Sequence, residues 1–118
     1  MIVRLVTATV KAERAGTFNA LMRAQLPELR QSPGLIYAKL ARRIQGDTEE
    51  VLLYEEWHDT ASLYAWTGPE ITRARLHPGA AELVTTLTVI HYEALDIDPE
   101  TREPVTGEPV PGGSAGQG

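Results

Sequence analysis

The chain has 118 residues and a mass of 12.9 kDa, which is the size of a single domain. Hydrophobic residues make up 42% and charged residues 23%, a composition typical of globular proteins that excludes a fibrous or wholly disordered chain. The absence of cysteine excludes disulfides, thiolate metal sites and thiol nucleophiles. No apolar run approaches the roughly 20 residues of a membrane-spanning helix, and the N-terminus lacks a signal-peptide pattern. We therefore expect a cytoplasmic enzyme or binding domain with no membrane partner.

The net charge of −5 hides an asymmetry along the chain. Residues 1–48 carry eight Lys and Arg against three Asp and Glu, whereas residues 49–118 carry three against thirteen. The basic residues are scattered singly, apart from Arg42-Arg43, and no aromatic residues alternate with them. A nucleic-acid surface would need a basic block or stripe. We therefore expect no nucleic-acid partner.

The residue patterns in the first part of the chain predict a strand followed by a helix. A strand is predicted over Ile2–Val10, which is rich in β-branched residues. Apolar residues from Phe18 to Leu29 then recur at helical spacing and predict an amphipathic helix. Pro27 lies inside this stripe and is expected to kink the helix or split off its last turn. Ser32-Pro33-Gly34 ends it.

Three further strands are predicted from patterns of β-branched and aromatic residues. Two of them, Leu35–Ile44 and Glu50–Trp57, are joined by turn residues and should form a hairpin. The last strand is predicted at about Thr86–Leu95.

A second helical region separates the hairpin from the last strand. A short helix is expected from Asp59 or Thr60 through Trp66. Pro69 then restarts a turn or two of helix up to His77. His77 would thus lie at the carboxyl end of a helix, where the helix dipole favours the imidazolium form.

The element order β-α-β-β-α-β predicts an α+β, ferredoxin-like fold, with an antiparallel four-stranded sheet and its helices on one face. The other face would be bare. In either register the first strand places aliphatic side chains there, Val6 and Ala8 in one and Val3 and Leu5 in the other. A second copy commonly covers such a surface. We therefore expect a homodimer with facing sheets, and ligand pockets between helices and sheet.

The C-terminal segment differs in composition from the rest of the chain. Residues 98–118 hold four of the eight prolines and five of the ten glycines. Such a segment cannot bury enough apolar surface to offset the entropy of ordering it. We expect a folded domain over residues 1–97 and a flexible Pro/Gly-rich tail over 98–118.

Three short motifs have a familiar spacing: Ser32-Pro33-Gly34-Leu35 with Leu40 and Gly46 beyond it, Leu53-Tyr54-Glu55-Glu56-Trp57, and Ala65-Trp66-x-Gly68-Pro69-x-Ile71. Over residues 2–96 the chain resembles the antibiotic biosynthesis monooxygenase superfamily of dimeric α+β barrels. Members include cofactor-independent quinone-forming monooxygenases and haem-degrading monooxygenases. The resemblance implies the fold and the dimer, but the fold hosts many activities.

The nearest resemblance is to the haem-degrading branch, which uses three residues. These are an Asn on the first strand, a Trp on the second helix and a His about nine or ten positions later. The Trp corresponds to Trp66. The Asn position falls at Val6, or at Thr7 in the next register. The His position falls at Ala74 when the motif is aligned on Gly68-Pro69. One of three positions is kept, so haem binding or degradation is an alternative, in which His77 would serve as axial ligand.

The first functional hypothesis is a cofactor-independent monooxygenase acting on a small aromatic substrate: a phenol, an anthrone or a quinol-like compound. Such a substrate, once deprotonated, can itself give an electron to O2. The protein then supplies a base, a dry apolar pocket and a place for oxygen. His77 and Trp66 are the predicted catalytic residues. The candidate roles are base for His77 or His91, pocket wall for Trp66 and Tyr54, and stabiliser of the developing anion for Tyr64 or Arg73.

A non-catalytic domain that binds a small ligand is the third hypothesis. The histidines lie 19 and 14 residues apart, without the pairing that metal sites require, so we expect no metal. Glu55 and Glu56 point to opposite faces of a strand and cannot share a proton. The sequence also lacks a glycine-rich phosphate loop and a G-x-S-x-G elbow.

Overall fold

The computed structural model describes residues 1–95, and the predicted tail over residues 98–118 lies outside them. The predicted β-α-β-β-α-β order is confirmed, and the four strands form one antiparallel sheet in the order β2-β3-β1-β4. The elements are β1 (Ile2–Lys11), a short 3-10 turn (Ala12–Arg14), α1 (Ala15–Arg30), β2 (Leu35–Gln45), β3 (Thr48–Trp57), α2 (Thr60–Thr67), α3 (Pro78–Ala81) and β4 (Val84–Glu93).

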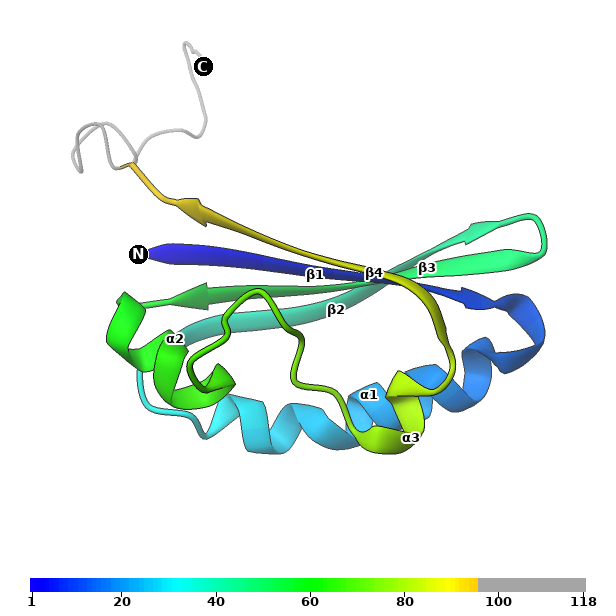
Figure 1. Cartoon of the computed structure of the whole chain (residues 1–118), viewed down its shortest axis with the longest axis horizontal. Coiled ribbons are helices and arrows are strands. Elements are labelled where there is room, and N and C mark those ends of the chain that lie inside the picture. Colours follow the sequence, from blue (N-terminus) through cyan, green and yellow to red (C-terminus); the bar gives the residue numbers. More distant parts are fainter. Residues whose placement is uncertain (96–118) are drawn as a thin grey trace, which may run out of the picture.

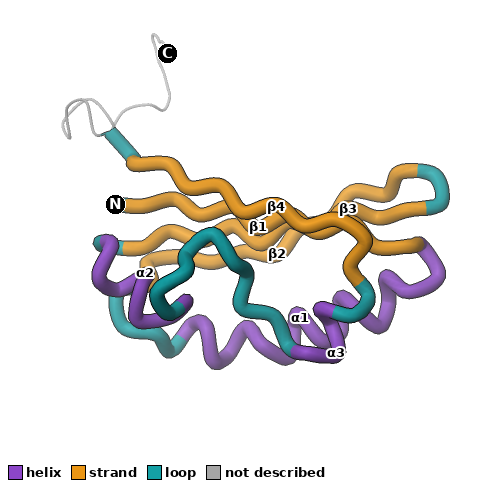
Figure 2. The backbone as a smooth tube through the Cα atoms, viewed as in Figure 1, coloured by secondary structure: helices purple, strands orange, loops and turns teal. Residues whose placement is uncertain are grey.

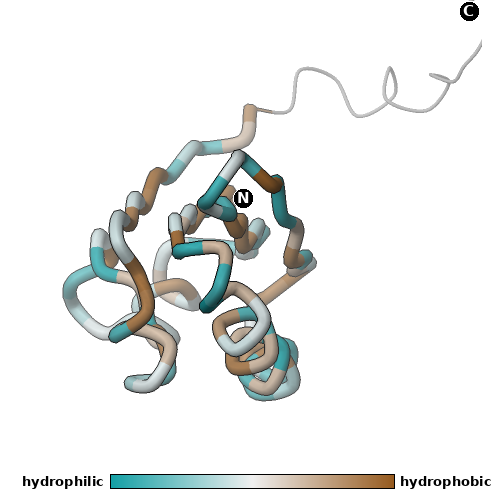
Figure 3. The backbone as a smooth tube through the Cα atoms, turned by 90° about the vertical axis from the view of Figure 1, so that its right-hand side faces the viewer, coloured by the Kyte–Doolittle hydropathy of each residue, from teal (hydrophilic) through white to brown (hydrophobic). Residues whose placement is uncertain are grey.

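All the described helices lie on one side of the sheet (Figure 1). Figure 2 shows the loop between α2 and α3 on this same side, and Figure 3 shows from one end that the opposite side of the sheet is open. The expected two-layer arrangement of the α+β fold is therefore confirmed. No helix within residues 1–95 is long and apolar enough to cross a membrane; the cytoplasmic location stays a prediction.

The register of β1 decides which side chains face the helices. Burial alternates along the strand, and Val6, Ala8 and Val10 are buried beneath the helices. Val3 and Leu5 lie on the open face, beside Tyr92 of β4 and Tyr54 of β3 respectively. The first of the two predicted registers, which exposed Val6 and Ala8, is therefore wrong. Both faces of β1 are aliphatic, so composition alone did not distinguish them.

Helix α1 packs its apolar stripe on the sheet. Phe18, Met22 and Leu29 are buried in the same core as Trp57. The helix continues through Pro27 to Arg30, so the expected loss of its last turn does not occur. Proline removes one backbone hydrogen bond there, and burial of Leu29, which is 1% exposed, holds the turn in place.

Residues 68–77 form no helix, which corrects the prediction that Pro69 restarts one. Gly68 ends α2 with a positive φ of 81°, and the chain then crosses to α3 as an irregular loop. Arg4 of β1 donates hydrogen bonds to the carbonyls of Ile71 and Arg73 in this loop. A helix would use such carbonyls for its own bonds, so the contacts with Arg4 favour the open conformation.

Candidate functional site

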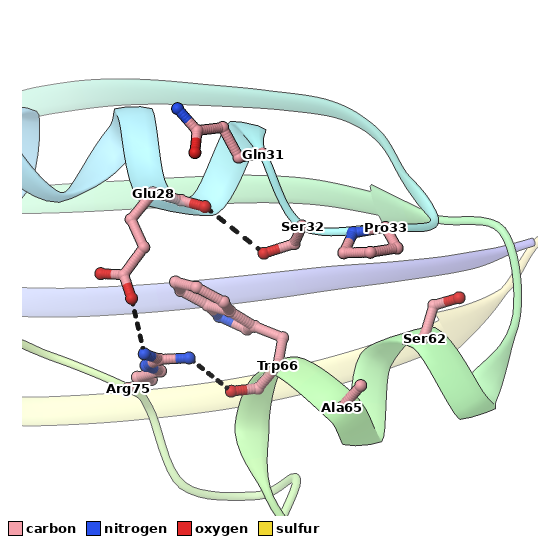
Figure 4. A pocket seen from close by; sticks show the side chains of 8 residues that line it. All are labelled: Glu28, Gln31, Ser32, Pro33, Ser62, Ala65, Trp66 and Arg75. Atoms are coloured by element: carbon pink, nitrogen blue, oxygen red, sulfur yellow. Dashed lines mark hydrogen bonds and ion pairs between the residues drawn. The ribbon is translucent and has the colours of Figure 1, made fainter.

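A pocket of about 310 Å³ opens beside Trp66, between the end of α1 and helix α2 (Figure 4). Trp66 is 8% exposed, and its indole packs against Trp57 with the ring centroids 6.5 Å apart. Trp66, which the resemblance put on the second helix, thus lies on α2 in the wall of a pocket, and its catalytic role stays a prediction. The pocket is lined by Glu28, Gln31, Ser32, Pro33, Ser62, Ala65, Trp66 and Arg75.

The Ser32-Pro33-Gly34 turn brings α2 close to the end of α1. Gly34 has a φ of 87°, a left-handed conformation that favours glycine, and a Cβ at this position would collide with the Ser62 side chain. This close approach explains why the turn ends in glycine. It also explains why residues far apart in sequence form one pocket rim.

Arg75 closes one side of the Trp66 pocket. Its guanidinium lies 4.0 Å from the centroid of the Trp66 ring, a cation–π contact. Nη1 donates to the Trp66 carbonyl at 3.0 Å, and Nη2 donates to Glu28 Oε2 at 2.8 Å (Figure 4). The Arg75 carbonyl in turn accepts from Gln25 Nε2 at 2.9 Å. Together these contacts tie the loop to both helices and set a cation against an aromatic surface.

Arg75 also lines further spaces, and two of them share another residue with this pocket. One is a narrow, mostly apolar slot that also includes Trp66 and Gln25. The other is a pocket of about 300 Å³ that reaches His77 and also includes Gln25 and Glu28. Arg75 therefore lies between the three spaces.

His77 caps the start of α3, so its predicted place at the carboxyl end of a helix is wrong. Its Nδ1 accepts a hydrogen bond from the Gly79 backbone N–H at 3.0 Å. An accepting Nδ1 carries no proton, so in the neutral ring the proton is assigned to Nε2. His77 then offers no free lone pair to the adjoining pocket.

A buried polar cluster lies on the helix-facing side of the sheet. Arg4 and Glu55 are each 1% exposed, and Arg4 Nε lies 3.5 Å from Glu55 Oε1. Trp57 Nε1 donates to the same carboxylate oxygen at 2.7 Å. Burial raises the pKa of the Glu55 carboxyl, opposed by the Trp57 hydrogen bond and by Arg4. Because Arg4 also holds the carbonyls of Ile71 and Arg73, the cluster positions the loop that carries Arg75.

His91 belongs to this cluster and not to the Trp66 pocket. Its Nε2 lies 2.9 Å from Arg4 Nη1, and because arginine can only donate, Nε2 must accept. The ring is therefore neutral, with its proton assigned to Nδ1. Burial, and secondarily the charge of Arg4, lowers the pKa of His91.

The lowered pKa of His91 gives an expected pH dependence of stability. In the unfolded chain His91 binds a proton as the pH falls below about 6.5, whereas the folded protein resists until a lower pH. His91 therefore makes the free energy of unfolding decrease as the pH falls through this range. Glu55, whose pKa is raised, contributes the opposite slope. We expect His91→Gln, which keeps an acceptor for Arg4, to remove the His91 contribution while leaving Glu55 in place.

Urea unfolding of the wild type and of His91→Gln at pH 7.5 and at pH 5 measures this difference. The wild type should lose more stability on acidification than the variant does. Equal slopes for the wild type and His91→Gln would contradict the assignment.

Three predicted residues lie away from the Trp66 pocket. Tyr54 is on the open face of the sheet, where its hydroxyl donates to Glu56 at 2.7 Å and this bond raises the pKa of Tyr54. The expectation that Tyr54 and Trp66 line one pocket is therefore wrong. Tyr64 is 43% exposed on α2. The Arg73 side chain is 78% exposed and pairs with Glu70 at 3.1 Å, so the cation beside Trp66 is Arg75 instead.

The residues at the haem-branch positions do not fit a haem as they lie. Val6 is buried in the core, and Ala74 offers only a methyl group. Protein ligands of haem iron are usually His, Cys, Met or Tyr, and the lining of the Trp66 pocket contains none of these. His77 lines the adjoining space beyond Arg75 and not the Trp66 pocket. Within residues 1–95, no three His, Asp or Glu side chains are grouped to hold a metal ion.

The sheet order and the single helical layer define a ferredoxin-like α+β protein, and its pocket lies between the end of α1 and α2 rather than between helices and sheet as expected. The antibiotic biosynthesis monooxygenase family model matches residues 1–75. The chain belongs to this family. A search of curated proteins gave no match.

Solved structures share the fold at low sequence identity. An antibiotic biosynthesis monooxygenase is 25% identical with a TM-score of 0.66, covering 81% of this chain and all (100%) of its own. A conserved protein from Methanosarcina mazei Go1 is 21% identical with a TM-score of 0.66, covering 80% and 94%. The haem-degrader MhuD from Mycobacterium tuberculosis, with two haems in its active site, is 21% identical with a TM-score of 0.59, covering 83% and 100%.

Proposed function

We propose that this protein is a cofactor-independent monooxygenase that oxidises a small phenol, anthrone or quinol-like substrate with O2 in the Trp66 pocket. The observation that carries the proposal is the Arg75 guanidinium held 4.0 Å from the Trp66 ring in the pocket wall. The part of the Trp66 side chain that reaches the pocket gives an aromatic ring an apolar contact. The cation stabilises the oxygen anion that forms when such a substrate loses a proton.

The reaction needs no electrons beyond those of the substrate. The anion transfers one electron to O2, and the substrate radical and superoxide combine to form a peroxide on carbon. Loss of the remaining proton from that carbon breaks the O–O bond and releases water. For an anthrone, the ring methylene group and one O2 thus give a carbonyl group and one water, and the substrate supplies all four electrons.

We assign the ionisation of the substrate to an arginine and not to either of the predicted histidine bases. Both predicted bases have a ring nitrogen occupied by an N–H donor, Nδ1 of His77 by Gly79 and Nε2 of His91 by Arg4. Arg75 is the charged group beside Trp66. We therefore assign the stabilisation of the anion to Arg75, with the proton released to water. His77→Ala should leave turnover unchanged.

Oxygen uptake tests the proposal. Purified protein in the presence of a metal chelator is mixed with 1,8-dihydroxyanthrone in an oxygen electrode. We expect uptake above the uncatalysed rate, with one O2 consumed per anthrone oxidised. Saturable binding without added uptake would instead support a non-catalytic ligand-binding domain. A hemin titration followed at the Soret band should show no stoichiometric site, and a band lost in His77→Ala would favour the haem alternative.

We also propose that the protein is a homodimer with its open sheet faces together. The face carries exposed aromatic and aliphatic side chains, including Tyr37 (46% exposed), Ile90 (46%) and Tyr92 (54%). These lie beside Leu5 and Tyr54 in neighbouring strands, so the apolar surface is continuous. A continuous apolar patch of this kind commonly marks an interface.

We expect Ile90→Lys to convert the dimer into a monomer, because it places a charge within the apolar face. Light scattering coupled to gel filtration measures the mass. Ile44 is the matched control, since it is 67% exposed near the end of β2 and pairs with the buried Glu49 on the other side of the sheet. Ile44→Lys should leave the dimer intact. A wild-type protein that is already monomeric would contradict the proposal.

A further inference from the structure

An ion pair between Arg75 and Glu28 separates the Trp66 pocket from the space beyond it. Arg75 lines the pocket, the narrow slot and the adjoining pocket near His77. Glu28 lines the two larger spaces. In Figure 4 the Glu28 carboxylate reaches from α1 to the guanidinium, which lies beside the Trp66 indole. The two charges therefore meet at the boundary that both spaces share.

The groups that hold the Arg75 guanidinium differ in how firmly they are fixed. The Trp66 indole and carbonyl belong to α2, and Trp66 is 8% exposed. The Glu28 side chain is 61% exposed and bonds Arg75 through a single oxygen at 2.8 Å. Exposed ion pairs of this kind contribute little to stability. An anionic group of a ligand can therefore replace Glu28 while the contacts with Trp66 persist.

A buried acceptor next to Arg75 lacks a donor. Gln25 Nε2 donates to the Arg75 carbonyl, but within residues 1–95 the buried Gln25 Oε1 has no hydrogen-bond partner. Buried polar atoms are nearly always paired, and an unpaired one is unfavourable. Gln25 and Arg75 together line the slot and the adjoining pocket. A ligand that opens the slot can thus reach both residues and give Oε1 a donor.

We propose that Glu28 is a displaceable latch on Arg75, and that this latch makes the site selective for aromatic anions. A phenolate or ring-carboxylate oxygen takes the place of the Glu28 carboxylate on Arg75, and the ring lies against Trp66. A second hydroxyl of the ligand donates to Gln25 Oε1. A neutral aromatic ligand binds without displacing Glu28, and therefore binds more weakly. The inference rests on the proposed function, because it names the charge of the substrate that the Trp66 pocket accepts.

The test compares an aromatic anion with its neutral counterpart in binding to the full chain. The probes are 2-naphthoate and 2-naphthamide, and binding is followed by calorimetry. We expect the wild type to bind naphthoate about 10-fold more tightly, as a charge-assisted contact with arginine would give. Glu28→Gln removes the competing carboxylate, so it should tighten naphthoate binding by about 3- to 10-fold and leave naphthamide unchanged.

The matched control is Glu70→Gln. It removes the same charge from the exposed Glu70–Arg73 pair. The two residues lie three positions apart in the same loop, with Arg73 Nη1 3.1 Å from Glu70 Oε1. Glu70→Gln should leave both affinities unchanged. An equal gain from Glu70→Gln and Glu28→Gln, an equal gain for both ligands, or no preference of the wild type for naphthoate would each overturn the latch.

Failure of the latch and failure of the oxygenase can be told apart. Neither naphthoate nor naphthamide reacts with O2, so the binding measurements do not require turnover. Selective tightening of naphthoate binding in Glu28→Gln, together with no oxygen uptake from the anthrone, would support the latch and contradict the proposed oxygenase function. Oxygen uptake from the anthrone, together with no effect of Glu28→Gln on naphthoate binding, would support the oxygenase and overturn the latch.

Discussion

Arg4→Met is expected to lower the free energy of unfolding by about 3–5 kcal/mol, as is usual when one partner of a buried ion pair is removed. The substitution leaves the Glu55 carboxylate buried without its cation, at a site that is 1% exposed. It also leaves the carbonyls of Ile71 and Arg73 without the donors that hold the loop. Urea unfolding at pH 7 measures the change.

Two further variants make this result specific. Arg43→Met breaks the exposed Arg43–Glu50 pair, whose atoms lie 2.9 Å apart on neighbouring strands, and should lower stability by less than about 1 kcal/mol. In the double variant Arg4→Met/Glu55→Gln the buried charge is gone, while the Trp57 N–H keeps an acceptor. Part of the lost stability should then return. Equal effects of Arg4→Met and Arg43→Met would contradict the role of the cluster.

Arg75→Met is expected to lower kcat/KM for anthrone oxidation by about 100-fold or more, the usual effect of removing a group that stabilises a developing oxyanion. Methionine keeps a flexible apolar stem against Trp66 but removes the charge and the hydrogen bonds to Trp66 and Glu28. Arg75 is 42% exposed in its side chain, so the fold should tolerate the change. Steady-state oxygen uptake over a range of anthrone concentrations gives kcat and KM separately.

Arg73→Met is the matched control for Arg75→Met. Arg73 is two residues away on the same loop, and its side chain is 78% exposed and points to Glu70 instead of Trp66. The variant keeps the Arg73 backbone carbonyl that Arg4 holds. It should retain kcat/KM within about twofold, since a change at an exposed surface site is generally mild. A comparable loss in both variants would show that the net charge of the loop matters and not the contact with Trp66.

The order of the elements could be predicted because local patterns determine it. β-Branched runs predicted the strands, and the apolar stripe from Phe18 to Leu29 predicted α1. The loop over residues 68–77 was missed because its conformation depends on Arg4, which lies 67 residues before Ile71. A single arginine in a strand gives no local sign that it will be buried and bind distant carbonyls.

The candidate site was predictable in part. Trp66 was located through a motif, and the structure places it in a pocket wall. Tyr54 was expected beside Trp66 on the helix-facing side, but it lies on the open face. Its neighbours Leu52 and Leu53 point to opposite faces and are both apolar, so the sequence pattern did not show which face is buried. Arg75 was missed, although it lies nine positions after Trp66, at the spacing expected for the histidine of the haem branch. Because an arginine stands at that spacing instead of a histidine, the motif did not assign Arg75 to the pocket.

The proposed activity requires that the protein itself, with no added metal or cofactor, insert an oxygen atom from O2 into an aromatic substrate. Oxidation of 1,8-dihydroxyanthrone under ¹⁸O2 with a chelator present, followed by mass spectrometry of the product, tests it most directly. We expect one ¹⁸O atom in the new carbonyl group, formed at a rate that Arg75→Met reduces and Arg73→Met does not. A product without ¹⁸O, or oxidation that begins only after hemin is added, would contradict it.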